Sequence, residues 1–209
     1  MAIKYYVRTT GERTLDSSFS QINYTLLIDY EHNAGKSWLK WAEEYFSKDD
    51  CVILEDDVIL CDNFKEQIEN IINEYPNEII NFYENGWHYF KTKKQLHFQQ
   101  NQCNYFPRNK MILIINTIKE NNFLNYSVAK MIRDALNYLK LENIIYKPHL
   151  VQHLDYDSLM GHFNKSFKRR TIYFIDYLNE LNINYDEANS KENKEKLYNL
   201  LNDKFKDVI

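Results

Sequence analysis

A short apolar run that ends in three consecutive acids constrains the fold of this chain more than any other feature. Residues 51–54 are all apolar and are followed at once by Glu55, Asp56 and Asp57. A strand without a polar position is typical of the centre of an α/β sheet that helices cover on both faces. Ligands bind beyond the carboxyl ends of such strands, so the three acids are expected at a ligand-binding edge.

The remaining segments alternate between strand-like and helix-like patterns, which predicts an α/β fold. Strands are expected over residues 3–7, 24–29, 78–83 and 144–146, with one or two more within 95–106. Helices are expected over 36–46, 64–72 (with Asp62 or Asn63 as N-cap) and 128–139, whereas 110–119 fits a helix or a strand. Two amphipathic helices, over 172–181 and 192–205, indicate an appendage. We therefore predict a main domain over residues 1–165 and a helical extension over 166–209 packed on it.

Composition narrows the class of protein. With 209 residues, of which 44% are hydrophobic, the chain is long enough for one principal core. It contains no run of eighteen apolar residues, and its first residues lack the pattern of a secretion signal. Cys51, Cys61 and Cys103 cannot all pair within one chain, and two of them lie in apolar, strand-like surroundings that favour a buried thiol. We expect a cytoplasmic protein without disulfides or a membrane span.

The acidic triplet is a candidate metal site. Because residues two apart in a strand point the same way, we expect Glu55 and Asp57 on one side and Asp56 on the other. Mg²⁺ and Mn²⁺ prefer oxygen ligands and are commonly held by one or two carboxylates together with substrate phosphates. A diphosphate site would follow from that arrangement. The alternative, a solvated acidic turn, is the commoner explanation of an isolated triplet.

Two motifs in sequence order resemble the glycosyltransferase A fold. The stretch from Gly35 to Leu60 resembles its nucleotide-sugar half, in which an Asp-x-Asp or Glu-Asp-Asp motif ends a strand. The stretch from Pro148 to Gly161 resembles the Pro-x-Leu-x-Gln-His pattern of type IV N-acetylglucosaminyltransferases and of some bacterial and phage relatives.

This resemblance implies a Rossmann-like mixed sheet flanked by helices in a catalytic domain over residues 1–165. It also implies a UDP-sugar donor and a Mn²⁺ or Mg²⁺ ion. Because the family's His after Gln completes the metal shell, the implied metal ligands are Glu55, Asp57 and His153.

The donor nucleotide is expected near the loop that follows the first strand, where the family binds it. Guanidinium groups suit phosphate and uracil oxygens, a carboxylate after the second strand suits uracil or ribose, and helix lysines suit the diphosphate. The candidates are Arg8, Thr9, Thr10, Arg13, Asp29, Lys36 (with Lys40 one turn on) and Asp56. An exposed basic loop and solvated lysines are the alternatives. Trp87 and His88 could stack on a sugar or a base, or Trp87 could pack in the core.

An inverting transfer needs a carboxylate that takes the acceptor proton. The candidates are Asp134, Glu84 and Asp155. In inverting relatives the acid lies at or near the start of a helix upstream of the metal-binding His. Asp134 is the nearest match, although it falls in the middle of the helix predicted over 128–139, where a solvated Asp is the alternative.

The acceptor is left open between several classes. A net charge of −4 means that a polyanion would need a local basic patch, and His162 to Arg170 is the one basic run interleaved with aromatic residues. Together with its small size, this resembles phage enzymes that glucosylate hydroxymethylated pyrimidines in DNA, which would act in the host cytoplasm. The alternatives are transfer to a surface polysaccharide or glycolipid precursor, and a non-catalytic protein that binds nucleotide sugars.

Overall fold

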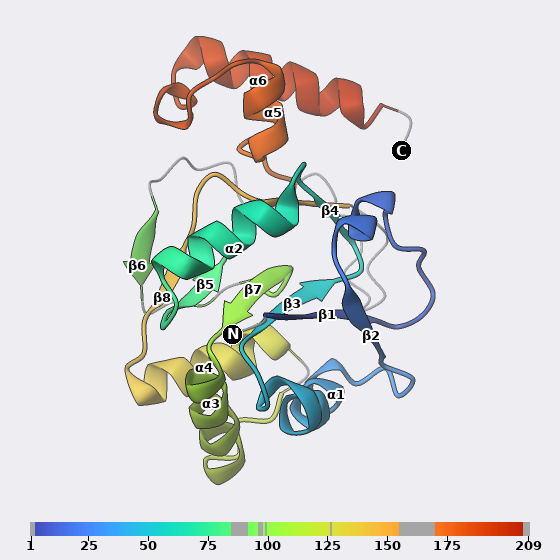
Figure 1. Ribbon diagram of the computed structural model, residues 1–209, viewed down its shortest axis with the longest axis vertical. Helices are drawn as coiled ribbons and strands as arrows, with labels where there is room; N and C mark the ends of the chain where they lie inside the picture. The colour runs from blue at the N-terminus through green and yellow to red at the C-terminus, as the bar shows by residue number, and fades with distance from the viewer. Residues whose placement is uncertain are drawn as a thin grey trace.

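A seven-stranded mixed sheet with helices on both faces forms the framework of the protein (Figure 1). The computed structural model describes residues 3–84, 92–95, 98, 100–125, 127–154 and 170–206. The strand order is β2-β1-β3-β7-β5-β8-β6, and a separate two-stranded sheet pairs β4 with β9. The predicted fold class, an α/β sheet flanked by helices, is therefore confirmed.

The segments predicted as strands and helices lie where the sequence pattern placed them. The strands are β1 (Lys4–Thr9), β2 (Tyr24–Ile28), β3 (Cys51–Glu55), β4 (Val58–Leu60), β5 (Ile79–Asn81), β6 (Lys93–Gln95), β7 (Cys103–Phe106), β8 (Asn143–Ile145) and β9 (Val151–His153). The helices are α1 (Ala34–Trp41, continued by a π-helical turn over Ala42–Phe46), α2 (Phe64–Glu74), α3 (Arg108–Glu120), α4 (Val128–Leu139), α5 (Ile175–Glu180) and α6 (Lys191–Lys204). The ambiguous segment over 110–119 is helical, whereas the sequence pattern did not predict β4 and β9.

Strand direction determines where the ends of the strands meet. β1 runs parallel to β2 and β3, and β5 runs parallel to β8. β7 is antiparallel to both β3 and β5, so β3 and β5 point the same way. The carboxyl ends of β1, β2, β3, β5 and β8 therefore lie along one edge of the sheet, where ligands bind in open α/β folds.

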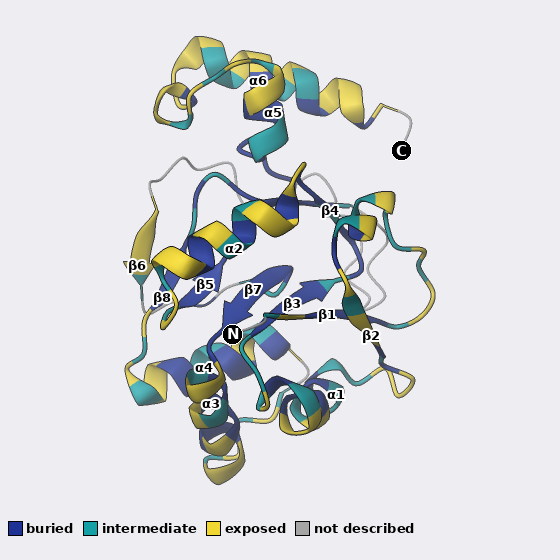
Figure 2. Cartoon of the chain, viewed as in Figure 1, coloured by how far each residue is buried: buried dark blue, intermediate teal, exposed yellow. Residues whose placement is uncertain are grey.

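Alternating side chains of the central strands fill two cores. Val52 and Leu54 of β3 pack in the core that includes α2, α5 and α6, while Cys51 and Ile53 pack in the core that includes α1, α3 and α4. Figure 2 shows β3 and β7 as buried between the two layers of helices. The apolar run at 51–54 has this burial on both faces, as predicted.

The start of α2 depends on a residue from another part of the chain. Asn63 occupies the N-cap position, but its side chain makes no capping hydrogen bond. The Gln21 side chain instead accepts from Phe64 N (3.0 Å) and donates to Cys61 O (3.0 Å). The prediction that Asp62 or Asn63 is the N-cap residue is therefore confirmed for Asn63, but a side chain from the 3₁₀ turn at Ser17–Gln21 satisfies the free N–H group in place of the Asn63 side chain.

The C-terminal helices share the core of the sheet. Tyr177 of α5 and Leu197 and Leu201 of α6 belong to the same hydrophobic cluster as α2. The Asp176 carboxylate also accepts from the backbone N–H of Asp62. The predicted boundary between residues 165 and 166 falls outside the described residues and stays a prediction.

Two further expectations can be compared with the structure. Cys51, Cys61 and Cys103 are buried and not in disulfides, as predicted. No helix in the described part of the chain combines the length and the apolar character needed to cross a membrane.

Candidate active site

The acidic triplet spans the end of β3 and the turn that follows it. The small β4-β9 sheet brings a histidine close to that turn. β3 ends at Glu55, and Asp56 and Asp57 form the turn into β4. Val58 pairs with His153 across the two strands, and Leu154 N donates to Asp57 O at 2.7 Å. His153 Nε2 consequently lies 3.4 Å from Asp57 Oδ2, with both side chains nearly buried.

Arginine and threonine side chains from the end of β1 and the loop after it bind the three carboxylates of the triplet. Arg8 Nη2 lies 2.5 Å from Glu55 Oε1, as the pairing of these two residues in the sheet allows. Thr9 Oγ1 donates to Asp56 Oδ2 at 2.5 Å. Arg13 Nη1 reaches both Asp56 Oδ1 (3.2 Å) and Asp57 Oδ2 (3.1 Å). We name this group the carboxylate cluster; it consists of Arg8, Thr9, Arg13, Glu55, Asp56, Asp57 and His153.

One sequence prediction about the triplet is wrong. Alternation along a continued strand placed Asp56 on the side opposite Glu55 and Asp57. Because the strand ends at Glu55, alternation does not extend into the turn, and one guanidinium group binds both Asp56 and Asp57. Glu55 instead pairs with Arg8, and the three carboxylates are divided between two arginines.

The carboxylate cluster is buried and rich in negative charge. Burial raises the pKa of Glu55, opposed by the Arg8 charge and reinforced by Asp57. Burial also raises the pKa of Asp56, opposed by the Thr9 hydrogen bond. Asp57 Oδ1 is buried and has no hydrogen-bond partner among the described residues. An oxygen of this kind is available to a ligand with a donor group or a positive charge.

The cluster fits a divalent cation only if the substrate supplies part of the coordination. Within the described residues, no three His, Cys, Asp or Glu side chains converge as a metal-binding group. Asp57 and His153 are close enough to act together, whereas Glu55 is engaged by Arg8. Two protein ligands plus diphosphate oxygens is a common arrangement for Mg²⁺ and Mn²⁺.

The other predicted donor-binding residues differ in their surroundings. Asp29 is buried and accepts from Ser37 Oγ (2.6 Å) and Glu31 N (3.2 Å), which stabilises the entry to α1. Lys36 and Lys40 are exposed on α1. Thr10 Oγ1 is buried and has no hydrogen-bond partner in the part of the chain that the structure describes. Asp29 therefore has a structural role that the sequence did not reveal.

A second polar group lies along the same edge of the sheet. Glu84 follows β5 and Lys147 follows β8, and Lys147 Nζ lies 3.5 Å from Glu84 Oε2. Lys147 Nζ also contacts His149 Nε2. The Tyr83 ring packs near both His149 and His153, with centroid separations of 5.4 and 6.2 Å. We name Tyr83, Glu84, Lys147 and His149 the lysine cluster.

The lysine cluster is deeply buried at its centre. Burial lowers the pKa of Lys147 to about 7, although Glu84 opposes the shift. Burial also lowers the pKa of His149 well below its ordinary value, and the Lys147 charge adds to this effect. Sequence reasoning missed Lys147; its position directly after a buried strand was the available signal.

Of the three candidate bases, the structure describes Asp134 and Glu84, which lie on different parts of the fold. Asp134 lies in the middle of α4, where Lys130 Nζ is 2.7 Å from Asp134 Oδ2, and α4 packs on α3 and α1. Glu84 lies at the carboxyl edge. Asp155 is outside the described residues, as are Trp87, His88 and residues 162–169. Arg170, the last residue of the basic run, is buried with its Cζ 3.9 Å from the Phe205 ring centroid.

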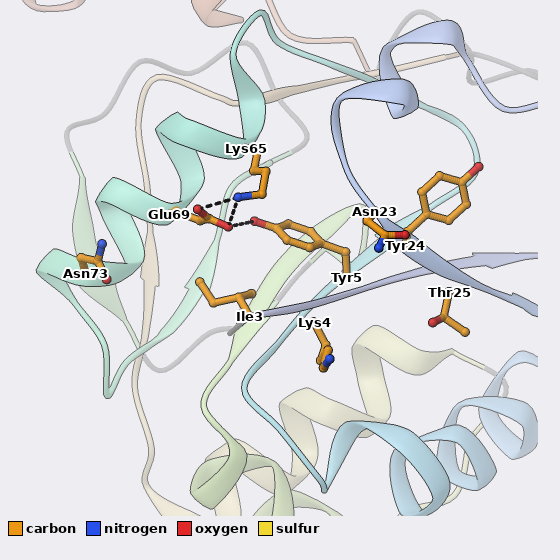
Figure 3. Close-up of a pocket in the computed structure, with 9 residues that line it drawn as sticks. All are labelled: Ile3, Lys4, Tyr5, Asn23, Tyr24, Thr25, Lys65, Glu69 and Asn73. Carbon is orange, nitrogen blue, oxygen red and sulfur yellow. Dashed lines mark hydrogen bonds and ion pairs between the residues drawn. The ribbon is translucent and has the colours of Figure 1, made fainter. Parts of the chain in front are cut away.

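A pocket of about 620 Å³ lies at the other end of β1 (Figure 3). Lys4 and Tyr5 line it from β1, and Lys65 and Glu69 line it from α2. Tyr5 Oη donates to Glu69 Oε1 at 3.2 Å, and Lys65 Nζ binds the same carboxylate. Because Arg8 and Thr9 lie at the opposite end of the strand, this pocket is separate from the carboxylate cluster.

Comparisons with known proteins bear on the activity. A search of curated proteins finds no match. The solved structures that match include one titled "Crystal Structure of A197 from STIV", with a TM-score of 0.41, 14% identity, and coverage of 74% of this chain and 86% of that chain. That similarity is too distant to support an argument.

The model of one family, glycosyltransferase family 25 (LPS biosynthesis protein), matches residues 38–145, or 108 of the 209 residues. The match includes the acidic triplet at residues 55–57 and Glu84, but it excludes β1, Lys147 and His153. An enzyme of this class needs a nucleotide-sugar donor and an acceptor. The chain belongs to glycosyltransferase family 25 and is a glycosyltransferase.

Proposed function

We propose that the chain transfers a hexose, with glucose as the expected sugar, from a UDP-sugar to an acceptor hydroxyl, and that the carboxylate cluster binds the donor diphosphate. The observation that carries this proposal is the convergence of Asp57, His153 and Arg13 at the carboxyl edge of the sheet. Substrate phosphates are held at such edges by guanidinium groups and by cations bound to carboxylates.

A divalent cation, Mn²⁺ or Mg²⁺, is part of the proposal. Asp57 and His153 would hold it, and Glu55 would join them if Arg8 moved to the donor. The buried, unpaired Asp57 Oδ1 supports this assignment because a cation compensates an oxygen that has no donor. When bound, such a cation neutralises the negative charge that develops on a departing nucleoside diphosphate.

Arg8 and Arg13 are proposed to bind the donor phosphates. Both guanidinium groups already lie beside carboxylates, so each can exchange a carboxylate partner for a phosphate without leaving the site. Thr9 holds Asp56 and so fixes the turn on which Asp57 sits. Thr10, Asp29 and Lys36 stay predicted contacts of the nucleotide.

Glu84 is the proposed general base. It lies at the same edge as the carboxylate cluster, and its side chain is 15% exposed, so it can touch an acceptor. In a direct displacement, the acceptor oxygen bonds to the anomeric carbon and the bond from that carbon to the phosphate oxygen breaks. The electron pair leaves with UDP, and the acceptor proton passes to the Glu84 carboxylate.

A saccharide or glycolipid precursor is the acceptor that the observations favour. The matching family is described as an LPS biosynthesis protein, which is a glycolipid pathway. A hydroxymethylated pyrimidine in DNA stays the alternative acceptor. Against it, Arg170 is buried against Phe205 and so is withdrawn from the basic run that would contact a DNA backbone.

The test is UDP release from a panel of UDP-sugars with Mn²⁺ present or removed. Wild type is compared with Asp57→Asn and His153→Ala, first with water as acceptor and then with LPS oligosaccharides or hydroxymethylated DNA. Metal-dependent turnover that both substitutions abolish supports the proposal. Tight UDP binding with no turnover of any donor would overturn it in favour of a binding protein. Turnover stimulated only by DNA, and falling steeply with salt, would reverse the choice of acceptor.

A further inference from the structure

The Lys147 ammonium group lies almost completely out of solvent, next to the carboxylate proposed as base. The Lys147 side chain is 1% exposed, and its Nζ lies 3.5 Å from Glu84 Oε2. Buried lysines are rare because desolvation of the charge is costly, and those that occur are paired. The chain therefore retains a destabilising group at this edge of the sheet, as functional sites often do.

The backbone around Lys147 is fixed on both sides. Lys147 N donates to Thr92 Oγ1 (3.0 Å), and that hydroxyl donates to Lys147 O (3.2 Å). Two residues on, His149 N donates to Tyr173 O and His149 O accepts from Ile175 N. The side chain is thus aimed at Glu84 from a rigid segment between β8 and β9.

Lys147 and Glu84 differ in how far their side chains are exposed to solvent, which gives them different roles. Lys147 at 1% exposure cannot touch an acceptor, whereas Glu84 at 15% exposure can. The His149 imidazole, which is fully buried, also contacts Lys147 Nζ through Nε2. Glu84 is therefore the partner through which Lys147 can act on an acceptor.

We propose that Lys147 is a positioning residue whose buried ammonium group holds Glu84 in place as an ionised carboxylate on the acceptor side of the active site. This inference rests on the proposed function, because it assumes that Glu84 takes the acceptor proton. It adds a residue that lies outside the family match and outside the carboxylate cluster.

Within the described part of the chain, three neighbouring groups act on the Lys147 charge. Glu84 attracts the ammonium group, Lys93 of β6 repels it, and the His149 imidazole is kept neutral by burial. Tyr83 packs its ring against His149. Lys147 is therefore a positive charge that favours the ionised form of Glu84, and its removal is expected to disfavour that form.

The primary variant is Lys147→Met, which keeps the length of the side chain and removes the charge. For UDP-sugar hydrolysis, kcat is expected to fall on the acid side of its pH profile. In Lys147→Met, this acid limb is expected to lie about one to three pH units higher than in wild type. At an acidic pH on this limb, kcat of Lys147→Met is then expected to be about tenfold or more below that of wild type. Lys147→Arg keeps the charge and is expected to keep the limb near its wild-type position. The dissociation constant of UDP with Mn²⁺ is expected to stay within about twofold, because the carboxylate cluster is intact.

Lys110→Met is the matched control. Lys110 Nζ lies 2.9 Å from Glu78 Oε2, so this second Lys–Glu pair anchors the opposite end of β5, away from the carboxyl edge. Loss of that pair should leave the pH profile unchanged. An equal shift in Lys110→Met would show that the effect is a general loss of stability, and the proposal would be wrong.

A double-mutant cycle tests whether Lys147 acts through Glu84. Glu84→Gln is expected to lower kcat strongly, and adding Lys147→Met should then cost less than about twofold. A further loss as large as that of Lys147→Met alone would overturn the inference. If wild type hydrolyses no UDP-sugar, the proposed function has failed instead. Normal wild-type turnover with an unmoved limb in Lys147→Met is the failure of this inference alone.

Discussion

His153 Nε2 lies 3.4 Å from Asp57 Oδ2, although the two residues come from opposite halves of the chain. The β4-β9 pairing places Val58 opposite His153, and the bond from Leu154 N to Asp57 O fixes the turn. One side chain is on β9 and the other is in a turn held by a backbone hydrogen bond, so the two form a pre-organised pair.

Removal of either member of the pair should abolish turnover while the protein stays folded. For Asp57→Asn and His153→Ala we expect kcat for UDP-sugar hydrolysis to fall roughly 100-fold or more, which is about 2.7 kcal/mol of transition-state stabilisation. Steady-state kinetics at saturating Mn²⁺, with circular dichroism as the folding control, measures this. Near wild-type rates in both variants would contradict the assignment.

Binding of metal and nucleotide should stabilise the protein by mass action. With Mn²⁺ and UDP at about 100 times the dissociation constant, the free energy of unfolding should rise by about 2.7 kcal/mol. For a chain of this size, that raises the melting temperature by about 5–11 °C. Thermal unfolding with each ligand alone and with both gives the comparison. Asp57→Asn should lose the part of the shift that depends on Mn²⁺.

Gln152, the Gln of the Pro-x-Leu-x-Gln-His motif, should stabilise the folded protein. The Gln152 side chain donates to Thr171 O (2.8 Å) and accepts from Thr171 N (2.9 Å) and His153 N (3.1 Å), all in the interior. Gln152→Leu leaves these backbone groups without partners, which costs about 3 kcal/mol of unfolding free energy. Urea denaturation measures the loss. Gln67→Leu, which removes an exposed hydrogen bond, should cost less than about 1 kcal/mol.

The stability of wild type should rise with pH relative to Lys147→Met. The pKa of Lys147 is about 7 in the folded protein, below its ordinary value of 10.5. Between these values the unfolded chain binds the proton and the folded chain does not, so the slope of unfolding free energy against pH is positive. Urea denaturation at several pH values above neutrality measures the difference between the two proteins. A constant difference would mean that Lys147 titrates normally.

The candidate bases Glu84 and Asp134 should behave differently. Glu84→Gln removes the proton acceptor at the carboxyl edge, so kcat should fall by about 100-fold or more. Asp134→Asn breaks an i, i+4 pair with Lys130 on α4 and should change kcat by less than about twofold. Kinetics of both variants with the same UDP-sugar decides between them. The reverse outcome would make Asp134 the base and would remove the basis for the role of Lys147.

The sequence by itself determined the fold class, and most elements, from local patterns. The run at 51–54 predicted a strand buried on both faces, and the helical spacing over 128–139 predicted α4. These signals are local because a strand or helix repeats its buried positions within a few residues. The family resemblance, built on two motifs, pointed to Asp57 and His153, which lie 3.4 Å apart in the structure.

Tertiary structure alone decided which partners each acidic residue has. Alternation failed at Asp56 because β3 ends one residue earlier, and no local pattern marks that end. Arg13 and Lys147 are placed by the folded chain next to carboxylates distant in sequence. Contacts of this kind depend on how β1, β3, β5, β8 and the β4-β9 pair are arranged in space. The sequence shows the types of these residues, but which of them pair depends on long-range packing, which local spacing does not encode.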